Sequence, residues 1–262
     1  MIPADKQQEI LRRLAAAEAE HDVRVLLAVE SGSRAWGFAS PDSDYDGRFI
    51  HANRPDWYAA VTLEEQRDVI EYPIVDDMDI NGWDLRKALR LFWKSNPAFV
   101  EWLQSPITYV ERGSLRRRCR ELLPEVYSIE RGVHHYRSMA KTNFREHLLH
   151  ERVRLKKYFY VLRALLSVRW LLEQRRPAPI EFARLLPLID AEPGLRAAID
   201  ELLDRKRVTP ELGLAPPIPA IQRFIVAELD RLERLALPVT ERGEVGALLN
   251  ELFRATLRET WG

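Results

Sequence analysis

Cysteine is nearly absent from this sequence, since Cys119 is the single one among 262 residues. One cysteine cannot form an intrachain disulfide, and a metal site built from cysteines alone is excluded. This usage is typical of a reducing compartment. No window approaches the roughly 18 apolar residues that a membrane-spanning helix needs, and the opening MIPADKQQEILRRL lacks an apolar signal core. We therefore expect a cytoplasmic protein with no membrane partner.

Net charge is also lacking, because Lys and Arg number 40 and Asp and Glu number 40. A neutral chain is not a general electrostatic binder of nucleic acid, so any contact with a polyanion requires local charge segregation. Residues 120–175 show such segregation, with twelve Lys or Arg against six Asp or Glu, a net of six positive charges. This segment is a candidate footprint for a polyanion. A helix face that balances an acidic neighbouring domain explains it equally well.

Hydrophobic residues make up 46% of the chain, enough for one large domain or two modest ones. Short apolar runs and helical periodicity predict the following elements: strands over 23–29, 44–52, 68–75, 78–83 and 107–110, and helices over 5–20, 85–94 and 98–103. From residue 114 onward the pattern is helical, including a predicted helix over 180–189. We predict an α+β protein, with a mixed β-sheet and flanking helices over residues 1–113 and an all-helical domain over 114–262.

Residues 30–50, ESGSRAWGFASPDSDYDGRFI, combine a small-residue turn with a pair of acids. Asp44 and Asp46 lie two positions apart on a predicted strand, so their side chains share one face, about 7 Å apart. Two such carboxylates repel each other unless a cation lies between them, and Mg²⁺ prefers carboxylate oxygens. Gly32 allows the backbone to approach a phosphate, and Ser33 adds a hydroxyl and an N–H donor. The stretch therefore predicts a phosphate and metal site.

The order of these features resembles a known group of enzymes. A strand, then Gly-Ser, about ten residues and Asp-x-Asp on the next strand is similar to the DNA polymerase β-type nucleotidyltransferase superfamily. The blocks GSRAWGFASPDSDYDGRFI, DLRKALRLFWKSNPAFVEWLQSPI and KKYFYVLRALLSVRW together resemble its YcgL-type branch from bacteria and phages, which is associated with RNA-repair genes. The resemblance covers most of residues 25–175. It implies a fold of the nucleotidyltransferase type.

The resemblance also implies a reaction. Members of the superfamily use Mg²⁺ or Mn²⁺ to move a nucleoside monophosphate from an NTP to an acceptor hydroxyl, and they release pyrophosphate. The candidate acceptors here are an RNA end, a protein side chain and a small metabolite. The alternative is a noncatalytic module that binds an NTP or RNA and acts as a partner protein.

A third carboxylate on a neighbouring strand is implied by the same resemblance, where it helps to bind metal and can activate the acceptor hydroxyl. The segment DMDINGWDLRK offers Asp79, early in a predicted strand, and Asp84, directly before a predicted helix. Asp84 has a ready explanation as a helix N-cap. We therefore predict Asp79, together with Asp44 and Asp46, as the catalytic and metal-binding set, and Asp84 remains the alternative third acid.

The predicted substrate contacts come from both domains. In the resembling family the segment after the strand lies beside the triphosphate, which implies that Gly32, Ser33 and Arg34 bind substrate. Lys157 and Tyr160 lie on one face of a predicted helix of the second domain. The resemblance implies that this domain closes the nucleotide cleft, with Lys157 reaching the phosphates and Tyr158 or Tyr160 lining the cleft. A solvated charge on a core helix is the alternative for Lys157.

Arg48 continues the alternation of the two acids by two further positions. A guanidinium at this position either neutralises the carboxylates in an ion pair or contacts a phosphate, and the sequence favours neither. The amphipathic helices expected over 217–236 and 241–260 could pack internally or against a second copy of the chain. The oligomeric state therefore stays open.

Overall fold

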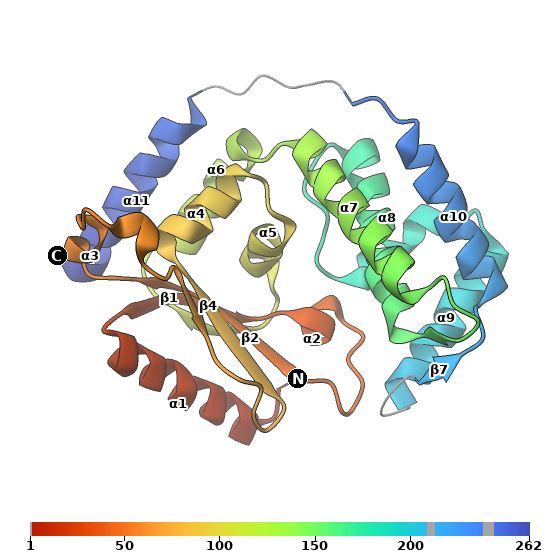
Figure 1. Cartoon of the computed structure of the whole chain (residues 1–262), viewed down its shortest axis with the longest axis horizontal. Coiled ribbons are helices and arrows are strands. Elements are labelled where there is room, and N and C mark those ends of the chain that lie inside the picture. Colours follow the sequence, from red (N-terminus) through yellow and green to blue (C-terminus); the bar gives the residue numbers. More distant parts are fainter. Residues whose placement is uncertain (1, 209–212, 238–243) are drawn as a thin grey trace. The chain divides into compact units, whose positions relative to one another are not determined.

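The computed structural model describes residues 2–208, 213–237 and 244–262, and the chain divides into two compact units (Figure 1). The first unit contains residues 1–35, 44–127 and 242–262, and the second contains residues 36–43 and 128–241. The chain therefore passes between the units more than once. This division differs from the predicted one, which had a single boundary after residue 113.

The first unit contains a five-stranded sheet and the helices that cover it. Its strands are β1 (Arg24–Glu30), β2 (Tyr45–Ala52), β3 (Val69–Glu71), β4 (Met78–Asp84) and β5 (Thr108–Glu111). Its helices are α1 (Ala4–His21), α2 (Gly32–Trp36, which ends one residue into the second unit), α3 (Pro55–Tyr58), the 3-10 helix η1 (Leu63–Glu65), α4 (Leu85–Trp93), α5 (Pro97–Gln104), α6 (Leu115–Val126) and α11 (Val245–Trp261).

The strand order of the sheet is β3-β4-β2-β1-β5. The pair β2 and β4 is parallel, whereas the other neighbouring pairs are antiparallel. The strands β3 and β4 form an antiparallel hairpin, and β3 lies at the edge, two residues before Pro73. An edge is the position that tolerates a nearby proline, because its backbone donors have no neighbouring strand.

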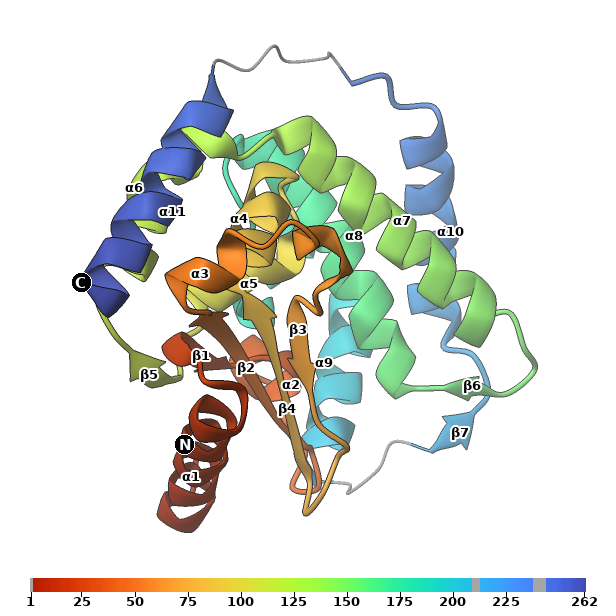
Figure 2. The same cartoon turned by 60° about the vertical axis from the view of Figure 1, so that its left-hand side comes forward.

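Two apolar layers enclose the sheet, which explains why β1 is apolar along most of its length. Figures 1 and 2 show α1 on one face and α4, α5, α6 and α11 on the other. On the first face, Ile10 and Leu14 of α1 pack with Phe49 of β2. On the opposite face, Phe92 of α4 and Leu249 of α11 belong to one buried cluster. A strand buried on both faces needs an apolar side chain at nearly every position.

Local capping fixes where the helices near the sheet begin. Asp84 is the N-cap of α4, and its carboxylate accepts a hydrogen bond from the backbone N–H of Arg86. Asn96 is the N-cap of α5 and accepts from Phe99 N–H, with Pro97 at the first helical position. Both caps satisfy backbone donors that would otherwise lack a partner.

The second unit is helical apart from a small two-stranded sheet. It contains α7 (Ile129–His147), β6 (Val153–Arg154), α8 (Lys156–Gln174), the 3-10 helices η2 (Phe182–Arg184) and η3 (Leu186–Ile189), α9 (Pro193–Val208), β7 (Leu214–Ala215) and α10 (Pro219–Glu233). The largely buried α8 packs against α7 and α10. Residues 36–43 join this unit, since the Phe38 ring stacks on Phe159 at a centroid distance of 4.7 Å.

Three details differ from the expected secondary structure and domains. The predicted helix over 180–189 is wrong, because η2 and η3 occupy that segment; prolines at 179, 187 and 193 interrupt continuous helix formation. The second domain is not all-helical, because β6 and β7 pair. The last helix, α11, packs with α4 and α6 in the first unit, whereas the expected division assigned it to the second.

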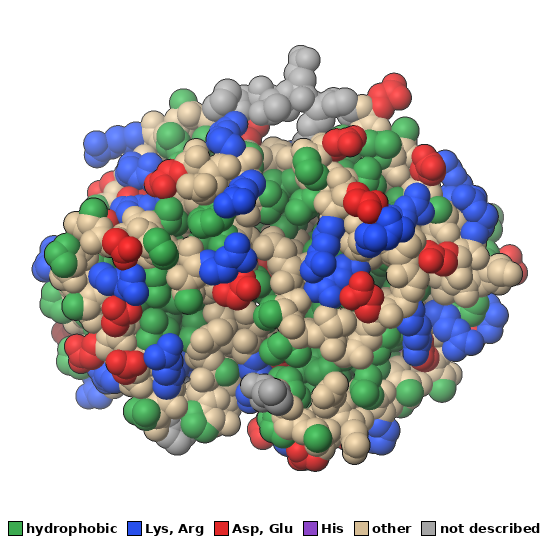
Figure 3. All heavy atoms as spheres, turned by 180° about the vertical axis from the view of Figure 1, so that it is seen from behind, with side chains coloured by type: hydrophobic (Ala, Val, Ile, Leu, Met, Phe, Trp, Pro, Cys, Tyr) green, Lys and Arg blue, Asp and Glu red, His purple; other side chains and the backbone are tan. Residues whose placement is uncertain are grey.

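The described surface carries both signs of charge. On the face seen in Figure 3, Lys and Arg side chains are interspersed with Asp and Glu side chains, in keeping with the zero net charge. Among the described residues, no helix is both long enough and apolar enough to cross a bilayer.

Candidate active site

The register of β2 and β4 brings two of the predicted acids together. In this parallel pair Asp46 lies directly opposite Asp79, and Arg48 lies opposite Asn81. Adjacent strands lie about 4.8 Å apart, so the two carboxylates share one small region of the sheet. Their side chains are 25% and 20% exposed, so they remain accessible to a ligand while water only partly solvates them.

Arg48 joins the two carboxylates. Its Nη2 donates to Asp79 Oδ2 at 2.6 Å and to Asp46 Oδ1 at 3.2 Å, and its Nη1 donates to the Asp79 carbonyl oxygen at 2.6 Å. Asn81 donates to the other Asp79 oxygen, Oδ1, at 2.5 Å. One guanidinium therefore forms an ion pair with both acids, and its single charge offsets only part of their negative charge. Of the two roles considered for Arg48, the structure contains the ion pair.

The turn after β1 packs directly on Asp46. The backbone N–H of Ser31 donates to the Asp46 carbonyl oxygen at 2.9 Å, and the N–H of Asp46 donates to Glu30 Oε1 at 3.0 Å. Gly32 has a φ of +59°, and a Cβ atom added there would lie 1.9 Å from Asp46 Oδ2. Only glycine adopts this conformation without strain and leaves room for the carboxylate. The Gly-Ser turn and the acid thus form one packed unit.

Burial raises the pKa of two carboxyl groups in this region, those of Asp46 and Glu30. Burial is the largest cause of the raised pKa of Asp46, the positive charge of Arg48 opposes it, and the negative charges of Asp79 and Asp44 add to it. The fully buried Glu30 has its pKa raised from 4.5 to about 7 by burial, although a hydrogen bond from the Tyr109 hydroxyl lowers it. Each of these carboxylates is therefore easier to protonate than an exposed one.

The remaining predicted contacts of the turn lie near the acids. Asp44 is exposed, directly before β2, and its carbonyl oxygen accepts from Arg34 Nε at 3.2 Å. The Arg34 guanidinium lies 4.0 Å from the centre of the Tyr45 ring. Ser33 is half-buried in α2. The structure thus places Gly32 against Asp46, and the substrate-binding roles of Gly32, Ser33 and Arg34 stay predictions.

Asp84, the alternative third acid, has structural partners. It is completely buried, caps α4, and accepts hydrogen bonds from the Tyr58 hydroxyl at 2.6 Å and Asn53 Nδ2 at 3.0 Å. It pairs in register with His51, five positions along β4 from Asp79. Its location is consistent with a helix cap, and the geometry favours Asp79 as the partner of Asp46.

Lys157 and Tyr160 lie on α8 in the second unit. The Lys157 ammonium lies 4.9 Å from the centre of the Tyr160 ring. Burial is the largest cause of the lowered pKa of Lys157, and the positive charges of Lys156 and Arg154 add to it. The edge of the Tyr160 ring also contacts Trp36. These contacts hold both side chains on the helix surface, and their action on a nucleotide stays a prediction.

The carboxylates at Asp46 and Asp79 suit a divalent cation in kind. Carboxylate oxygens are the ligands that Mg²⁺ prefers, and these two acids already share one cationic group, the Arg48 guanidinium. In the described part of the chain, no three His, Cys, Asp or Glu side chains are grouped closely enough to hold a metal. The pair of Asp46 and Asp79 offers two carboxylates to such an ion. Asp44 does not form a group of three with them.

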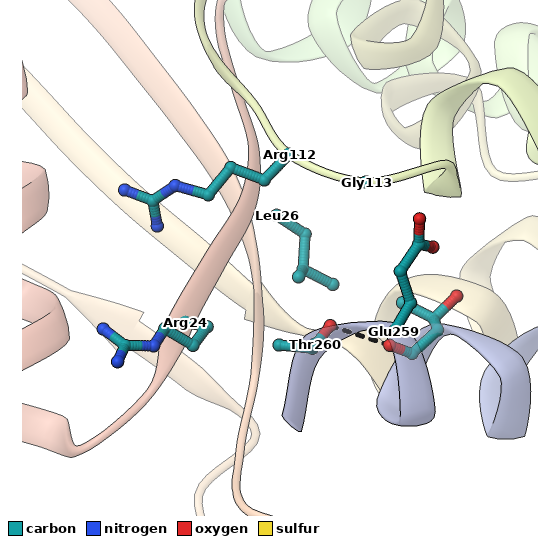
Figure 4. A pocket seen from close by; sticks show the side chains of 7 residues that line it. Arg24, Leu26, Arg112, Gly113, Glu259 and Thr260 are labelled. Carbon is teal, nitrogen blue, oxygen red and sulfur yellow. Dashed lines mark hydrogen bonds between the residues drawn. The ribbon is translucent and has the colours of Figure 1, made fainter. Parts of the chain in front are cut away.

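A separate pocket of about 370 Å³ lies at the far end of β1 (Figure 4). Arg24 begins this strand and Glu30 ends it, so the pocket lies roughly 20 Å from the acids by strand rise. In Figure 4 the side chains of Arg24 and Arg112 extend to the same side, away from Glu259. The Glu259 carboxylate accepts from both the backbone N–H and the hydroxyl of Ser114. This pocket lies between α11 and the sheet, and none of Glu30, Asp46 and Asp79 lines it.

Comparison with known proteins identifies the family of this chain. Residues 7–255 match the family described as RNA repair pathway DNA polymerase beta family. The chain belongs to this family. A relative, uncharacterized protein YcgL of Bacillus subtilis (strain 168), is 43% identical over 256 residues, which cover 97% of this chain and 98% of that protein. Membership in the polymerase beta family over nearly the whole chain confirms the resemblance seen in the sequence.

A solved structure was also found, that of a nucleotidyltransferase-like protein from Exiguobacterium sibiricum 255-15. The match covers 97% of this chain and 76% of that chain, at 13% identity and a TM-score of 0.31. A similarity at this level supports no argument about the site. The polymerase beta family assignment therefore rests on the sequence matches.

Three further members of the site, Glu30, Tyr109 and Asn81, were not predicted from the sequence. Glu30 gave a signal, because it is the only acid at the end of an otherwise apolar strand, directly before the Gly-Ser turn. Asn81 gave a weaker one, because it shares the alternation of Asp79 along β4. Tyr109 gave none, because its contact with Glu30 spans 79 positions of sequence.

Proposed function

We propose that this protein is a divalent-metal-dependent nucleotidyltransferase. It moves a nucleoside monophosphate from an NTP to an acceptor hydroxyl, with an RNA end as the leading acceptor. The observation that carries the proposal is the pairing of Asp46 with Asp79 on parallel strands, with the Gly32 backbone packed against Asp46. Membership in a polymerase beta family supports the same reaction class.

The proposed reaction is an in-line displacement at the α-phosphorus of the NTP. The acceptor oxygen forms a bond to this phosphorus, and the bond from phosphorus to the oxygen bridging the α- and β-phosphates breaks. The electron pair of that bond leaves with pyrophosphate. The hydroxyl proton passes to Asp79, the proposed general base. Each Asp79 oxygen accepts one hydrogen bond, from Arg48 or from Asn81, so lone pairs remain for the proton.

Asp46 and Asp79 are the residues that would hold Mg²⁺ or Mn²⁺. Such an ion, when bound, supplies positive charge that stabilises the attacking and leaving oxygens. Gly32 and Ser33 offer backbone and hydroxyl donors to the triphosphate, and Arg34 offers a guanidinium. Lys157 and Tyr160 are proposed to contact the nucleotide from the second unit. Arg48 has to share the carboxylates with the ion or turn toward a phosphate.

The test is a transfer assay with α-labelled NTPs, Mg²⁺ or Mn²⁺ and a pool of RNA ends. Asp46→Asn and Asp79→Asn are expected to lower transfer by about 100-fold or more, the usual size of such losses. Asp42→Asn, a change of the same kind in the exposed turn before β2, serves as the matched control and is expected to retain transfer.

Two results would contradict the proposal or one of its parts. A wild-type protein that neither binds an NTP with metal nor transfers label refutes the enzymatic function. If Asp79→Asn retains transfer while a folded Asp84→Asn variant loses it, the third acid is Asp84. Circular dichroism on each variant separates loss of chemistry from loss of fold.

A noncatalytic NTP- or RNA-binding module is the second candidate. The ion pairs of Arg48 with both acids favour it, because Arg48 already occupies carboxylate oxygens that a metal would need. In that case NTP or RNA binds without release of pyrophosphate under any metal condition. Pyrophosphate release measured beside nucleotide binding on one sample therefore separates the two functions.

A further inference from the structure

The second unit contains a hollow between α7 and the end of α10 whose lining is mainly basic and polar. Its volume is about 620 Å³. It is lined by His134, Arg137, Ser138, Lys141, Leu229 and Glu233. We refer to it as the α7–α10 pocket. Glu233 is the single acid among these lining residues, and Leu229 the single apolar side chain.

The polar lining comes from one face of α7. His134, Arg137, Ser138 and Lys141 lie at positions i, i+3, i+4 and i+7, which places them along one stripe of a helix. Arg145 follows four positions after Lys141 on the same stripe. The stripe covers 11 positions from His134 to Arg145, or about 16 Å of helix. The other face of α7 is apolar and buried, so the basic stripe is its outer face.

The charges of this stripe converge on the carboxylate of Glu233. Lys141 Nζ donates to Glu233 Oε1 at 2.6 Å. The hydrogen bond from Lys141 is the largest cause of the lowered pKa of Glu233, followed by the charge of Lys141, and the charges of Arg145 and Arg137 add to it. The carboxylate thus marks a position where an anion lies in the field of three cations.

The contacts with α10 do not use every donor of this stripe. Arg137 Nη1 donates to the Leu232 carbonyl oxygen at 3.0 Å, which caps the end of α10. Guanidinium carries five N–H donors and ammonium three; these contacts use one of each group, and Arg137 Nη2 also lies 3.4 Å from His134 Nδ1. The Ser138 side chain is exposed and also faces the pocket. A tetrahedral phosphate oxyanion could use the remaining donors, and a flat carboxylate uses fewer of them.

We propose that the α7–α10 pocket binds a backbone phosphate of a single-stranded polynucleotide, in place of the Glu233 carboxylate. The length of the stripe favours a polymer over a lone phosphate, because Arg145 extends the positive charge beyond the pocket. The excess of basic residues over 120–175 agrees with this placement. The inference does not depend on nucleotidyl transfer, because it needs neither an NTP nor a metal.

The test measures binding of a fluorescein-labelled single-stranded RNA oligonucleotide of mixed sequence, without NTP and without divalent metal, over a series of salt concentrations. Lys141→Gln is expected to weaken binding and to make the slope of log K against log salt shallower by about 0.7, the value for one lost phosphate contact on a single strand. Glu233→Gln is expected to tighten binding, because it removes the competing anion. These opposite signs cannot both arise from a loss of fold.

The matched controls are Arg184→Gln and Glu181→Gln, which alter an exposed ion pair elsewhere in the second unit. Both are expected to leave the salt slope unchanged. Equal slopes for wild type and Lys141→Gln would overturn the inference, as would weaker binding by Glu233→Gln. Inorganic phosphate provides the last arm. If it binds the pocket in a Lys141-dependent way while the oligonucleotide does not bind, the ligand is a free phosphate and the polymer assignment is wrong.

Discussion

The buried carboxyl of Glu30 makes the stability of the first unit depend on pH. Its pKa rises from 4.5 to about 7 on folding, because burial disfavours the charged form. A group whose pKa is raised in the folded state contributes stability that is fully present below pH 4.5 and is lost as the pH rises through about 7. The difference corresponds to about 3 kcal/mol in the free energy of unfolding.

Glu30→Gln tests this reasoning, because an amide has the shape of the protonated acid and cannot ionise. The oxygen of the new amide can accept from Asp46 N–H, and its NH₂ group can donate to the Tyr109 oxygen, so both contacts of the native side chain persist. At about pH 4, where the carboxyl is mostly protonated in both the folded and the unfolded state, the variant should be as stable as the wild type. At about pH 8 it should be more stable, by up to ~3 kcal/mol.

The assay is urea unfolding at several pH values, followed by tryptophan fluorescence. Five of the seven tryptophans lie in the first unit, so its transition dominates the signal. Tyr109→Phe is the companion variant, because it removes the hydrogen bond that lowers the pKa of Glu30. It should move the pH-dependent loss of stability to higher pH. Equal pH dependence of wild type and Glu30→Gln would refute the reasoning, as would a Glu30→Gln protein less stable than wild type at about pH 8.

Two further changes probe the same region. Gly32→Ala should lower the free energy of unfolding by about 1–2 kcal/mol from its left-handed backbone alone. It should also abolish transfer, because a Cβ atom 1.9 Å from Asp46 Oδ2 displaces the carboxylate. The control is Gly194→Ala, where a Cβ meets no atom within 4 Å, and equal melting temperatures for the two variants would contradict the clash. Arg48→Met should lower the melting temperature without metal, because Asp46 and Asp79 then repel each other with no cation between them. It should also enlarge the increase in melting temperature that Mn²⁺ causes in differential scanning fluorimetry. An unchanged increase would show that Arg48 and the ion do not compete.

Local patterns in the sequence were sufficient to predict most of the first unit. Alternation and apolar runs predicted its strands. Helical periodicity predicted α1, α4 and α5 because each presents one apolar face to the sheet. The same reasoning failed over 180–189, where the apolar spacing suggested a helix that the interrupting prolines do not permit.

The Gly-Ser turn, the acids at 44 and 46 and the polymerase beta family to which they point were predictable without a structure, because these residues lie within one short stretch. Which distant residues meet there depends on the folded chain. The parallel register of β2 and β4 places Asp79 opposite Asp46, and β5 brings Tyr109 to Glu30. Which strands pair, and in which register, depends on how whole layers pack together. A short stretch of sequence does not specify it. The return of α11 to the first unit has the same origin, since its apolar face is buried among side chains more than 100 positions away.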